Sequence, residues 1–299
     1  MSLYNIDGNA VSSVYGINGN ILDHAYSVEG TDIYDRSGAA DYDTYAIDNY
    51  LPFSVANAQG FDIFNGVLFQ FRGSGSINNI MNTYDCTLQS AITTGISANS
   101  QHGDSASFSD EYYSESDTYP LLYVTADTNP ALVYVNRVTD STSSLVRTLS
   151  FPLDKTGYYA AACCDFENNL LYMVGYTEQN YLTDNGGSNK VKISKWDLSS
   201  LTDNGNNTYT PAYISACERA FIYCMQGQQY HDGLMWIASG YSSHAGYIYA
   251  VSPSDGDIKH TINLNTTSEV EGLSWLDDLH MVVGYQGKNY QKVTFATVT

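Results

Sequence analysis

An eleven-residue frame recurs along this chain and constrains its fold more than any other feature. The frame holds a polar residue followed by Gly, a four-residue strand, a turn with Asn or Asp, and a second strand entered through apolar residues. Its three clearest copies begin at Gln59, Gln226 and Glu271. Weaker copies begin at His102, where an insertion follows the head, and at Ala162, where the polar-Gly head is replaced. A recurring hairpin frame predicts a repeated β architecture.

Further predicted strands follow each head, so each copy of the frame opens a unit of up to four strands. The predicted strands are 61–64, 67–71, 77–84 and 87–92; 105–108, 121–126, 131–138 and 144–151; 160–166, 170–176, 190–198 and 209–214; 227–230, 234–239, 246–251 and 257–264; and 272–276, 279–285 and 290–295. Four-stranded units that repeat without helical periodicity are typical of a β-propeller, and five units predict five blades. The alternative, a long β-sandwich, gives no reason for the same head to recur.

The fifth unit has three predicted strands before the chain ends at Thr299. A ring leaves no open sheet edge when one blade takes strands from both ends of the chain. We therefore predict that residues 45–55 supply the missing strand. The predicted fold class is all-β: a five-bladed β-propeller over residues 37–299, its last blade closed by an N-terminal strand, preceded by short β-hairpin repeats over residues 1–36.

The first 36 residues carry a shorter repeat. Tyr4, Tyr15 and Tyr26 each open a segment in which Tyr and Ile or Val alternate with small or polar residues before Asp-Gly, Asn-Gly or Glu-Gly. Asp-Gly and Asn-Gly favour tight hairpin turns, so three small hairpins are predicted. Hairpins of this size cannot bury a core alone and should pack on the main domain, on another chain or in a larger assembly.

These segments resemble the short Tyr-x-Ile/Val-x-Gly-Asn repeats at the N-termini of tail-associated proteins of gut phages and prophages, where they precede varied C-terminal domains. The resemblance covers roughly 30 residues, and its motif is short. It implies attachment or oligomerisation through residues 1–36 and a virion or extracellular location without a classical signal peptide. The alternative is a small β-meander with no attachment role.

Charge and cysteine pattern exclude several classes of partner and site. Acidic residues number 32 and basic residues 12, for a net charge of −20, which should repel nucleic acid and anionic lipid. No long apolar run or secretory signal pattern is present, so no membrane insertion is expected. The five cysteines lack zinc or disulfide spacing, and no metal or cofactor is predicted, although the acidic loops 184–187 and 203–207 could ligate calcium.

The repeated heads predict a polar ring. In a propeller the innermost strands run side by side around a channel, so Gln59, His102, Gln226 and Glu271, with Ala162 in the weak unit, should meet at its mouth. The Gly after each polar head allows close approach of the backbones. We predict that this ring binds a ligand; the alternative is that it holds only ordered water.

A second candidate surface is aromatic. The chain has 27 tyrosines, and Tyr113, Tyr159, Tyr176 and Tyr241 fall in loops or at strand starts, where propellers place recognition. Exposed Tyr beside acids suits sugars or protein partners. The expected function is therefore non-catalytic: a tail receptor-binding or adhesin-like module that recognises a glycan or surface protein of a host cell.

The alternative function is a glycoside hydrolase or lyase, since five-bladed propellers include such enzymes. Glycoside cleavage ordinarily needs two carboxylates that face the bond, and Glu271 is the single acid at the ring position. Asp62 and Asp104 lie at offsets that strand alternation does not bring to one face. We predict no catalytic residue, with Glu271, Asp62 and Asp104 as the candidates if the chain is an enzyme. A purely structural role is the third hypothesis.

Overall fold

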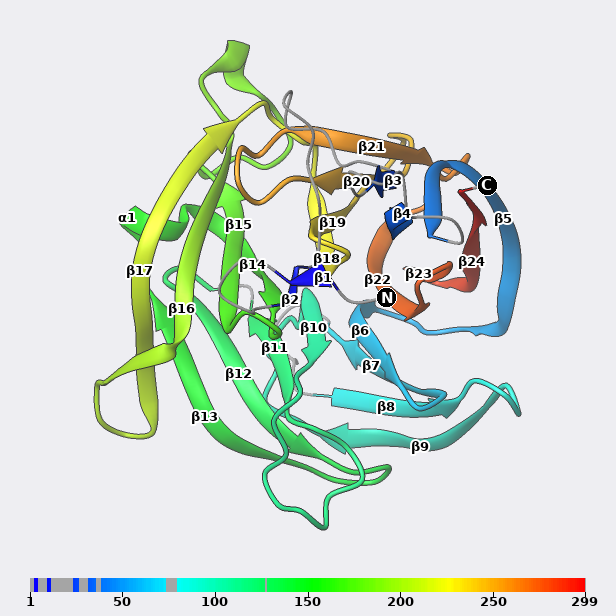
Figure 1. Cartoon of the computed structure of the whole chain (residues 1–299). Helices are drawn as coiled ribbons and strands as arrows, with labels where there is room; N and C mark the ends of the chain where they lie inside the picture. Colours follow the sequence, from blue (N-terminus) through cyan, green and yellow to red (C-terminus); the bar gives the residue numbers. More distant parts are fainter. Residues whose placement is uncertain are drawn as a thin grey trace. The chain divides into compact units, whose positions relative to one another are not determined.

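The computed structural model describes residues 3–4, 10–11, 24–26, 32–35, 39–73, 80–126 and 128–298. It divides into two compact units, one of Met1–Ala46 with Phe295–Thr299 and one of Ile47–Thr294. Strands fill most of the described chain (Figure 1). The helical elements among the described residues are the single turns α1 (Leu153–Thr156) and η1 (Asn185–Gly187). None of the described helices is long and apolar enough to cross a membrane.

Four short strands belong to the first unit, and twenty further strands follow them. The first four are β1 (Leu3–Tyr4), β2 (Ala10–Val11), β3 (His24–Tyr26) and β4 (Asp32–Asp35). The others are β5 (Ala40–Ser54), β6 (Ala58–Phe64), β7 (Val67–Arg72), β8 (Ile80–Asp85), β9 (Ser90–Ser97), β10 (Ser105–Phe108), β11 (Leu122–Ala126), β12 (Ala131–Val138), β13 (Ser143–Phe151), β14 (Tyr158–Asp165), β15 (Leu170–Tyr176), β16 (Val191–Asp203), β17 (Thr208–Arg219), β18 (Met225–His231), β19 (Leu234–Ser239), β20 (Tyr247–Val251), β21 (Ile258–Asn263), β22 (Val270–Asp277), β23 (His280–Tyr285) and β24 (Lys288–Thr297).

The strands form sheets that follow chain order. Three sheets have the orders β6-β7-β8-β9, β18-β19-β20-β21 and β22-β23-β24-β5. A larger sheet has the order β10-β11-β12-β13-β17-β16-β15-β14, in which two antiparallel sets of four meet through a short parallel pairing of β13 with β17. Strand β5 takes the fourth place of the last sheet, the place predicted for the segment before Gln59.

The first strand of each set of four lies nearest the centre of the second unit (Figure 1). Strand β6 contacts β10 and β22, β14 contacts β10 and β18, and β18 contacts β22. We call β6, β10, β14, β18 and β22 the inner strands. The result is an all-β, β-propeller-like arrangement in which the start of every inner strand faces the same central space.

The core lies between neighbouring sheets. Phe69 and Phe71 of one sheet pack with Leu122 and Val124 of the next, and Cys163 and Tyr172 pack with Met235 and Ile237 in the same way. Because each sheet is covered on both faces, the second strands are buried almost throughout; β15 shows this over Leu171–Tyr176. The outer strand β9 is largely exposed.

The first unit contains paired short strands. Strand β1 pairs antiparallel with β2, and β3 pairs antiparallel with β4, at the positions of the first and third predicted hairpins. The second predicted hairpin, at Tyr15, lies outside the described residues. Elsewhere in this unit Val298 N donates to Ala39 O at 2.8 Å, and the Tyr42 and Phe295 rings pack edge to face. Attachment through residues 1–36 stays a prediction.

Candidate functional site

A cavity of about 540 Å³ opens where the inner strands begin. Its lining is polar and aromatic: Gln59, His102, Asp104, Tyr159, Ala161, Tyr176, Tyr181, Cys224, Met225, Gln226, Tyr241, Glu269, Glu271 and Gln286. The structure thus brings together all the ligand-binding residues predicted from the sequence except Tyr113. The four polar heads and the tyrosines, which the sequence suggested as separate surfaces, share one site.

A β-bulge at the start of the inner strands turns the head residues toward this cavity. The pairing register shifts between Ala58 and Phe61 in β6, between Met225 and Gln228 in β18, and between Val270 and Gly272 in β22. A bulge adds a residue to one strand and re-aims its side chain. In β6, β18 and β22 the polar-Gly dipeptide of the sequence frame therefore marks a bulge.

The glycines of the heads bring the inner strands into backbone contact. A Cβ on Gly60 would lie 2.6 Å from Gly103 O, and a Cβ on Gly227 would lie 2.5 Å from Gly272 Cα. Gly60 N also donates to Gly103 O at 2.8 Å. We call Gly60, Gly103, Gly227 and Gly272 the glycine collar. Because a Cβ would collide with backbone atoms at Gly60 and Gly227, glycine allows the strands to approach closely and the head side chains to converge.

The third unit departs from the predicted frame. The chain between β14 and β15 spans residues 166–169, whereas the turns between β6 and β7 and between β18 and β19 span only 65–66 and 232–233. The eleven-residue frame assumes the shorter turn, so it assigned the head of this unit to a position too far along the chain. Ala162, the predicted ring member, is buried outside the cavity, and Tyr159 and Ala161 line it instead. The bulge of β14 lies between Tyr158 and Ala161.

Glu271 is the most unusual group in the cavity. Its residue is 2% exposed, and its Oε1 has no hydrogen-bond partner among the described residues. Burial, followed by the charges of Glu269 and Asp104, raises the pKa of Glu271 well above its ordinary value. A buried carboxyl without donors keeps its proton because ionisation would leave an unsolvated charge.

Glu269 is a second carboxyl in the same cavity and is only half-buried. Burial raises its pKa, and the nearby His102 opposes that rise. Gln226 Nε2 donates to Glu269 Oε1 at 3.3 Å. Glu269 therefore ionises more easily than Glu271, so the cavity holds one carboxyl suited to donate a proton and one suited to accept it. Glu271 is the single acid among the predicted head residues, but Glu269 and Asp104 also line the cavity.

Two further polar groups complete this acidic part of the cavity. His102 Nδ1 is hydrogen bonded to Asp104 Oδ1. Gln59 is 5% exposed, and its Oε1 has no hydrogen-bond partner among the described residues. Oxygens of Gln59 and Glu271 are thus buried at the cavity without a donor. A ligand that brings N–H groups would supply the missing donors.

Tyr176 lines the cavity, but its hydroxyl is already used. Tyr176 Oη donates to Ile222 O at 3.0 Å and accepts from Met225 N at 2.6 Å. Its side chain therefore fixes the segment that leads into β18. That Tyr176 binds a ligand stays a prediction, and such binding would use its ring rather than its hydroxyl.

Asp62, one of the three acids named for an enzyme, lies outside the cavity. Its Oδ1 accepts from Ile63 N at 2.8 Å, Gln229 Nε2 at 2.7 Å and Ser274 Oγ at 2.7 Å, and its Oδ2 accepts from Phe108 N at 2.7 Å. Asp62 thereby ties β6 to β10, β18 and β22. It is a structural acid; Asp104 is the aspartate that joins Glu271 in the cavity.

Tyr113 also lies apart from the site. It is 58% exposed in the loop between β10 and β11, with the Arg137 guanidinium 5.0 Å from its ring centre. Arg137 in turn pairs with Asp117 at 2.6 Å. Tyr113 therefore belongs to a surface loop, because the insertion in the second unit carries it away from the inner strands.

Sequence reasoning missed several cavity residues, of which Glu269 matters most. Glu269 stands two positions before the head Glu271, just ahead of β22, and this nearness in the sequence was a signal that could have identified it. Tyr181 is one of the tyrosines that the sequence places in loops or at strand starts. It sits in the loop after β15 and reaches the site because Cys224 N donates to Tyr181 O at 3.0 Å.

The acidic loops do not build a metal site among the described residues. No group of three or more His, Cys, Asp or Glu side chains in the described chain could hold a metal ion. Asp184 Oδ1 accepts from Gly186 N at 3.1 Å, and Asp203 Oδ1 accepts from Gly205 N at 2.7 Å. These two loops predicted as calcium ligands are turns whose acids bind their own backbone.

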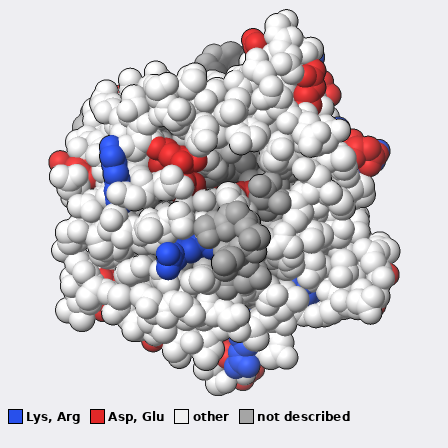
Figure 2. Space-filling view, turned by 180° about the vertical axis from the view of Figure 1, so that it is seen from behind, with Lys and Arg blue, Asp and Glu red and all other residues white. Residues whose placement is uncertain are grey.

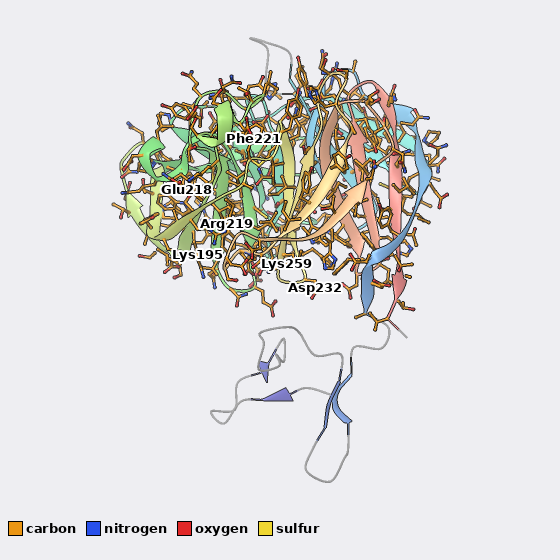
Figure 3. All side chains as sticks on the ribbon, turned by 90° about the horizontal axis from the view of Figure 1, so that it is seen from above. Lys195, Glu218, Arg219, Phe221, Asp232 and Lys259 are labelled. Atoms are coloured by element: carbon orange, nitrogen blue, oxygen red, sulfur yellow. The ribbon has the colours of Figure 1, made fainter. Side chains whose placement is uncertain are left out.

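Basic side chains are sparse on the face shown in Figure 2, in keeping with the net charge. Several charged residues instead lie on outer strands: Lys195 on β16, Glu218 and Arg219 on β17, and Lys259 on β21 (Figure 3). These charges are no part of the cavity lining. The cavity itself carries three carboxyls and one histidine, so it favours a cationic ligand.

Comparison with known proteins supports the fold and changes the functional expectation. No protein-family model matches the chain, and no curated protein matches it. A solved structure that it resembles is a glutaminyl cyclase of Myxococcus xanthus, with a TM-score of 0.54 and 12% identity over 85% of this chain and 97% of that one. The shared fold is that of an enzyme. The expectation of a non-catalytic tail-borne binding module is therefore wrong.

Proposed function

We propose that this chain is an acid–base enzyme that cyclises an N-terminal glutaminyl residue, with the cavity as its active site. The observation that carries the proposal is Glu271: a buried carboxyl with a raised pKa, whose Oε1 has no hydrogen-bond partner in the described part of the chain, at a cavity that also holds the more easily ionised Glu269. Perturbed carboxyls in a concave site are typical of catalytic groups. The glutaminyl cyclase of similar fold supplies the reaction class.

The scaffold that we propose for this site is a five-bladed β-propeller. The contacts of the five inner strands, each leading a set of four strands, support five blades around one axis. Each blade then delivers one head to the cavity. A rigid ring of this kind can hold side chains from distant parts of the chain within reach of one small substrate.

The reaction needs several proton transfers, and the two glutamates can divide them. Glu269 as carboxylate takes a proton from the α-ammonium of the substrate, and the freed amine attacks the γ-carboxamide carbon. Glu271 gives its proton to the departing amide nitrogen, so the C–N bond breaks and ammonia leaves, and the ring nitrogen then gives its second proton back to Glu271. The products are a five-membered lactam, ammonia and one proton, which Glu269 releases to solvent. No oxidant or reductant takes part.

The remaining polar groups fit the donors of such a substrate. An α-ammonium and a primary carboxamide both present N–H groups, and the unpaired Gln59 Oε1 is an acceptor at the cavity. Asp104 with His102, and Gln226 with Glu269, hold the acidic groups in place. A substrate that is acidic at its first residue would be repelled by the other two acidic side chains of the cavity, Glu269 and Asp104.

The test is a direct assay with a peptide that begins with glutamine. Ammonia release and the change in mass of the peptide are the two measurements. The wild-type chain should cyclise it, and Glu271→Gln should lower kcat by about a hundredfold or more, because the proton donor is lost with little change in shape. Glu218→Gln, an exposed acid on β17, is the matched control and should keep full activity. A folded wild type that fails to cyclise the peptide, or a fully active Glu271→Gln, would refute the proposal.

A further inference from the structure

The cavity has an aromatic part that the acid–base chemistry does not use. Tyr159 and Tyr181 line it beside the small residue Ala161. Their rings lie 4.9 Å apart, edge to face at 70°. Proton transfer at a glutaminyl residue needs neither ring, so their presence calls for a different ligand group.

Tyr159 is held in a backbone conformation that bulky residues avoid. Its φ is +50°, at the bulge that opens β14. A positive φ places the Cβ of an L-residue against its own carbonyl, and such outliers cluster where a side chain must be aimed. The polar heads Gln59 and Gln226 occupy the corresponding bulge position in β6 and β18, whereas here the chain keeps a tyrosine that lines the cavity.

Tyr181 is fixed from its backbone. Cys224 N donates to Tyr181 O at 3.0 Å, and the Tyr181 ring packs against Tyr176 at 6.5 Å. Tyr176 is itself anchored through its hydroxyl to Ile222 and Met225. The two rings therefore stand in a preformed arrangement, which spares a ligand the cost of ordering them.

We infer that Tyr159 and Tyr181 form a subsite for the side chain of the second residue of the peptide, and that this subsite favours an aromatic side chain. The inference rests on the proposed function, because the acidic part of the cavity must hold the first residue. From there the chain of the substrate continues away from its ammonium group. Aromatic rings prefer edge-to-face or offset contact with other rings, which this pair offers.

The experiment compares Gln-Phe-amide with Gln-Ala-amide as substrates. The wild type should show a kcat/KM about three- to tenfold higher for Gln-Phe-amide. Tyr159→Gly and Tyr181→Ala should each bring the ratio close to one, whereas Tyr159→Phe should keep it. Glycine accepts a positive φ, so Tyr159→Gly should fold. Tyr113→Ala, an exposed tyrosine outside the cavity, is the matched control and should leave the ratio unchanged.

The outcomes separate the two proposals. Cyclisation with equal rates for both dipeptide amides, or a preference that survives both Tyr159→Gly and Tyr181→Ala, overturns the subsite and leaves the proposed function standing. If neither peptide is cyclised, the proposed function fails. The subsite is then judged by calorimetric binding of Gly-Phe-amide and Gly-Ala-amide: tighter binding of the former that is lost in Tyr159→Gly supports it, and equal or absent binding overturns it.

Discussion

Asp62 and Glu271 are two buried carboxyls on inner strands of the same fold, and their surroundings differ in one respect. Asp62 accepts hydrogen bonds from four donors on β6, β10, β18 and β22. Glu271 has an oxygen without a partner among the described residues and opens onto the cavity. Burial raises the pKa of both groups, but hydrogen bonds oppose the rise at Asp62.

The comparison shows how a protein separates a structural acid from one that is available to a ligand. Donors stabilise a carboxylate and at the same time commit it to the fold. A carboxyl without donors contributes little to the fold but can exchange a proton with a ligand. Both residues follow from the same repeated frame, three positions after Gln59 for Asp62 and at the head itself for Glu271.

The largest effect on stability should come from Asp62. Asp62→Ala leaves the four donors without an acceptor and should lower the free energy of unfolding by about 3 kcal/mol or more. Urea denaturation monitored by tryptophan fluorescence measures the loss. Ser274→Ala, which removes a single donor to Asp62, is the graded control and should cost about 1 kcal/mol. Equal losses for the two variants would show that the four contacts do not act at Asp62.

The glycine collar should come next. Gly227→Ala places a Cβ 2.5 Å from the Cα of Gly272, the residue that follows Glu271. Strands β18 and β22 must therefore move apart. We expect a loss of about 2 kcal/mol in the free energy of unfolding. The loss of the proposed cyclase activity should exceed that of Asp62→Ala when both variants are assayed under fully folded conditions, because the displaced strand carries Glu271. A melting temperature of Gly227→Ala equal to that of the wild type would contradict the close backbone contact that we assign to the glycine collar.

The smallest effect concerns the pH dependence of stability. Because the folded state raises the pKa of Glu271, the folded chain binds this proton more tightly than the unfolded chain. The resulting stability is present below the ordinary value of 4.5 and is lost as pH rises through the raised pKa. Each unit of that rise corresponds to about 1.4 kcal/mol.

Thermal unfolding of wild type and Glu271→Gln over a pH series isolates this contribution, since all other groups are common to both chains. The stability of Glu271→Gln relative to wild type should increase as pH rises above 4.5. A difference that does not change with pH would mean that Glu271 titrates alike in the folded and unfolded chains. It would also remove the physical basis for Glu271 as the proton donor.

The local pattern of residues was enough to predict much of the architecture. The predicted strands 105–108, 131–138, 170–176 and 234–239 coincide with β10, β12, β15 and β19 at both ends. The heads Gln59, His102, Gln226 and Glu271 were predicted to meet, and all four line one cavity. These predictions succeed because strand alternation, turns and Gly-containing bulges each depend on residues that are close together in the sequence.

Other features depended on distances that the sequence does not contain. Ala162 was predicted at the ring because the longer turn of its unit could not be recognised from the sequence. The pairing of β14 with β15 places the bulge earlier, and Tyr159 and Ala161 line the cavity. Tyr181 enters from a loop. Whether a buried acid has hydrogen-bond donors depends on residues from other strands. Gln229 and Ser274 are such donors to Asp62.

The sequence by itself therefore determined the repeat, most of the strands and the polar character of the ring, because each of these is a local property of the chain. The tertiary structure decided which buried acid is left with an unpartnered oxygen at the cavity, among the described residues. That property depends on the balance of burial, neighbouring charge and available donors around Glu271, and this balance exists only when strands from distant parts of the chain come together.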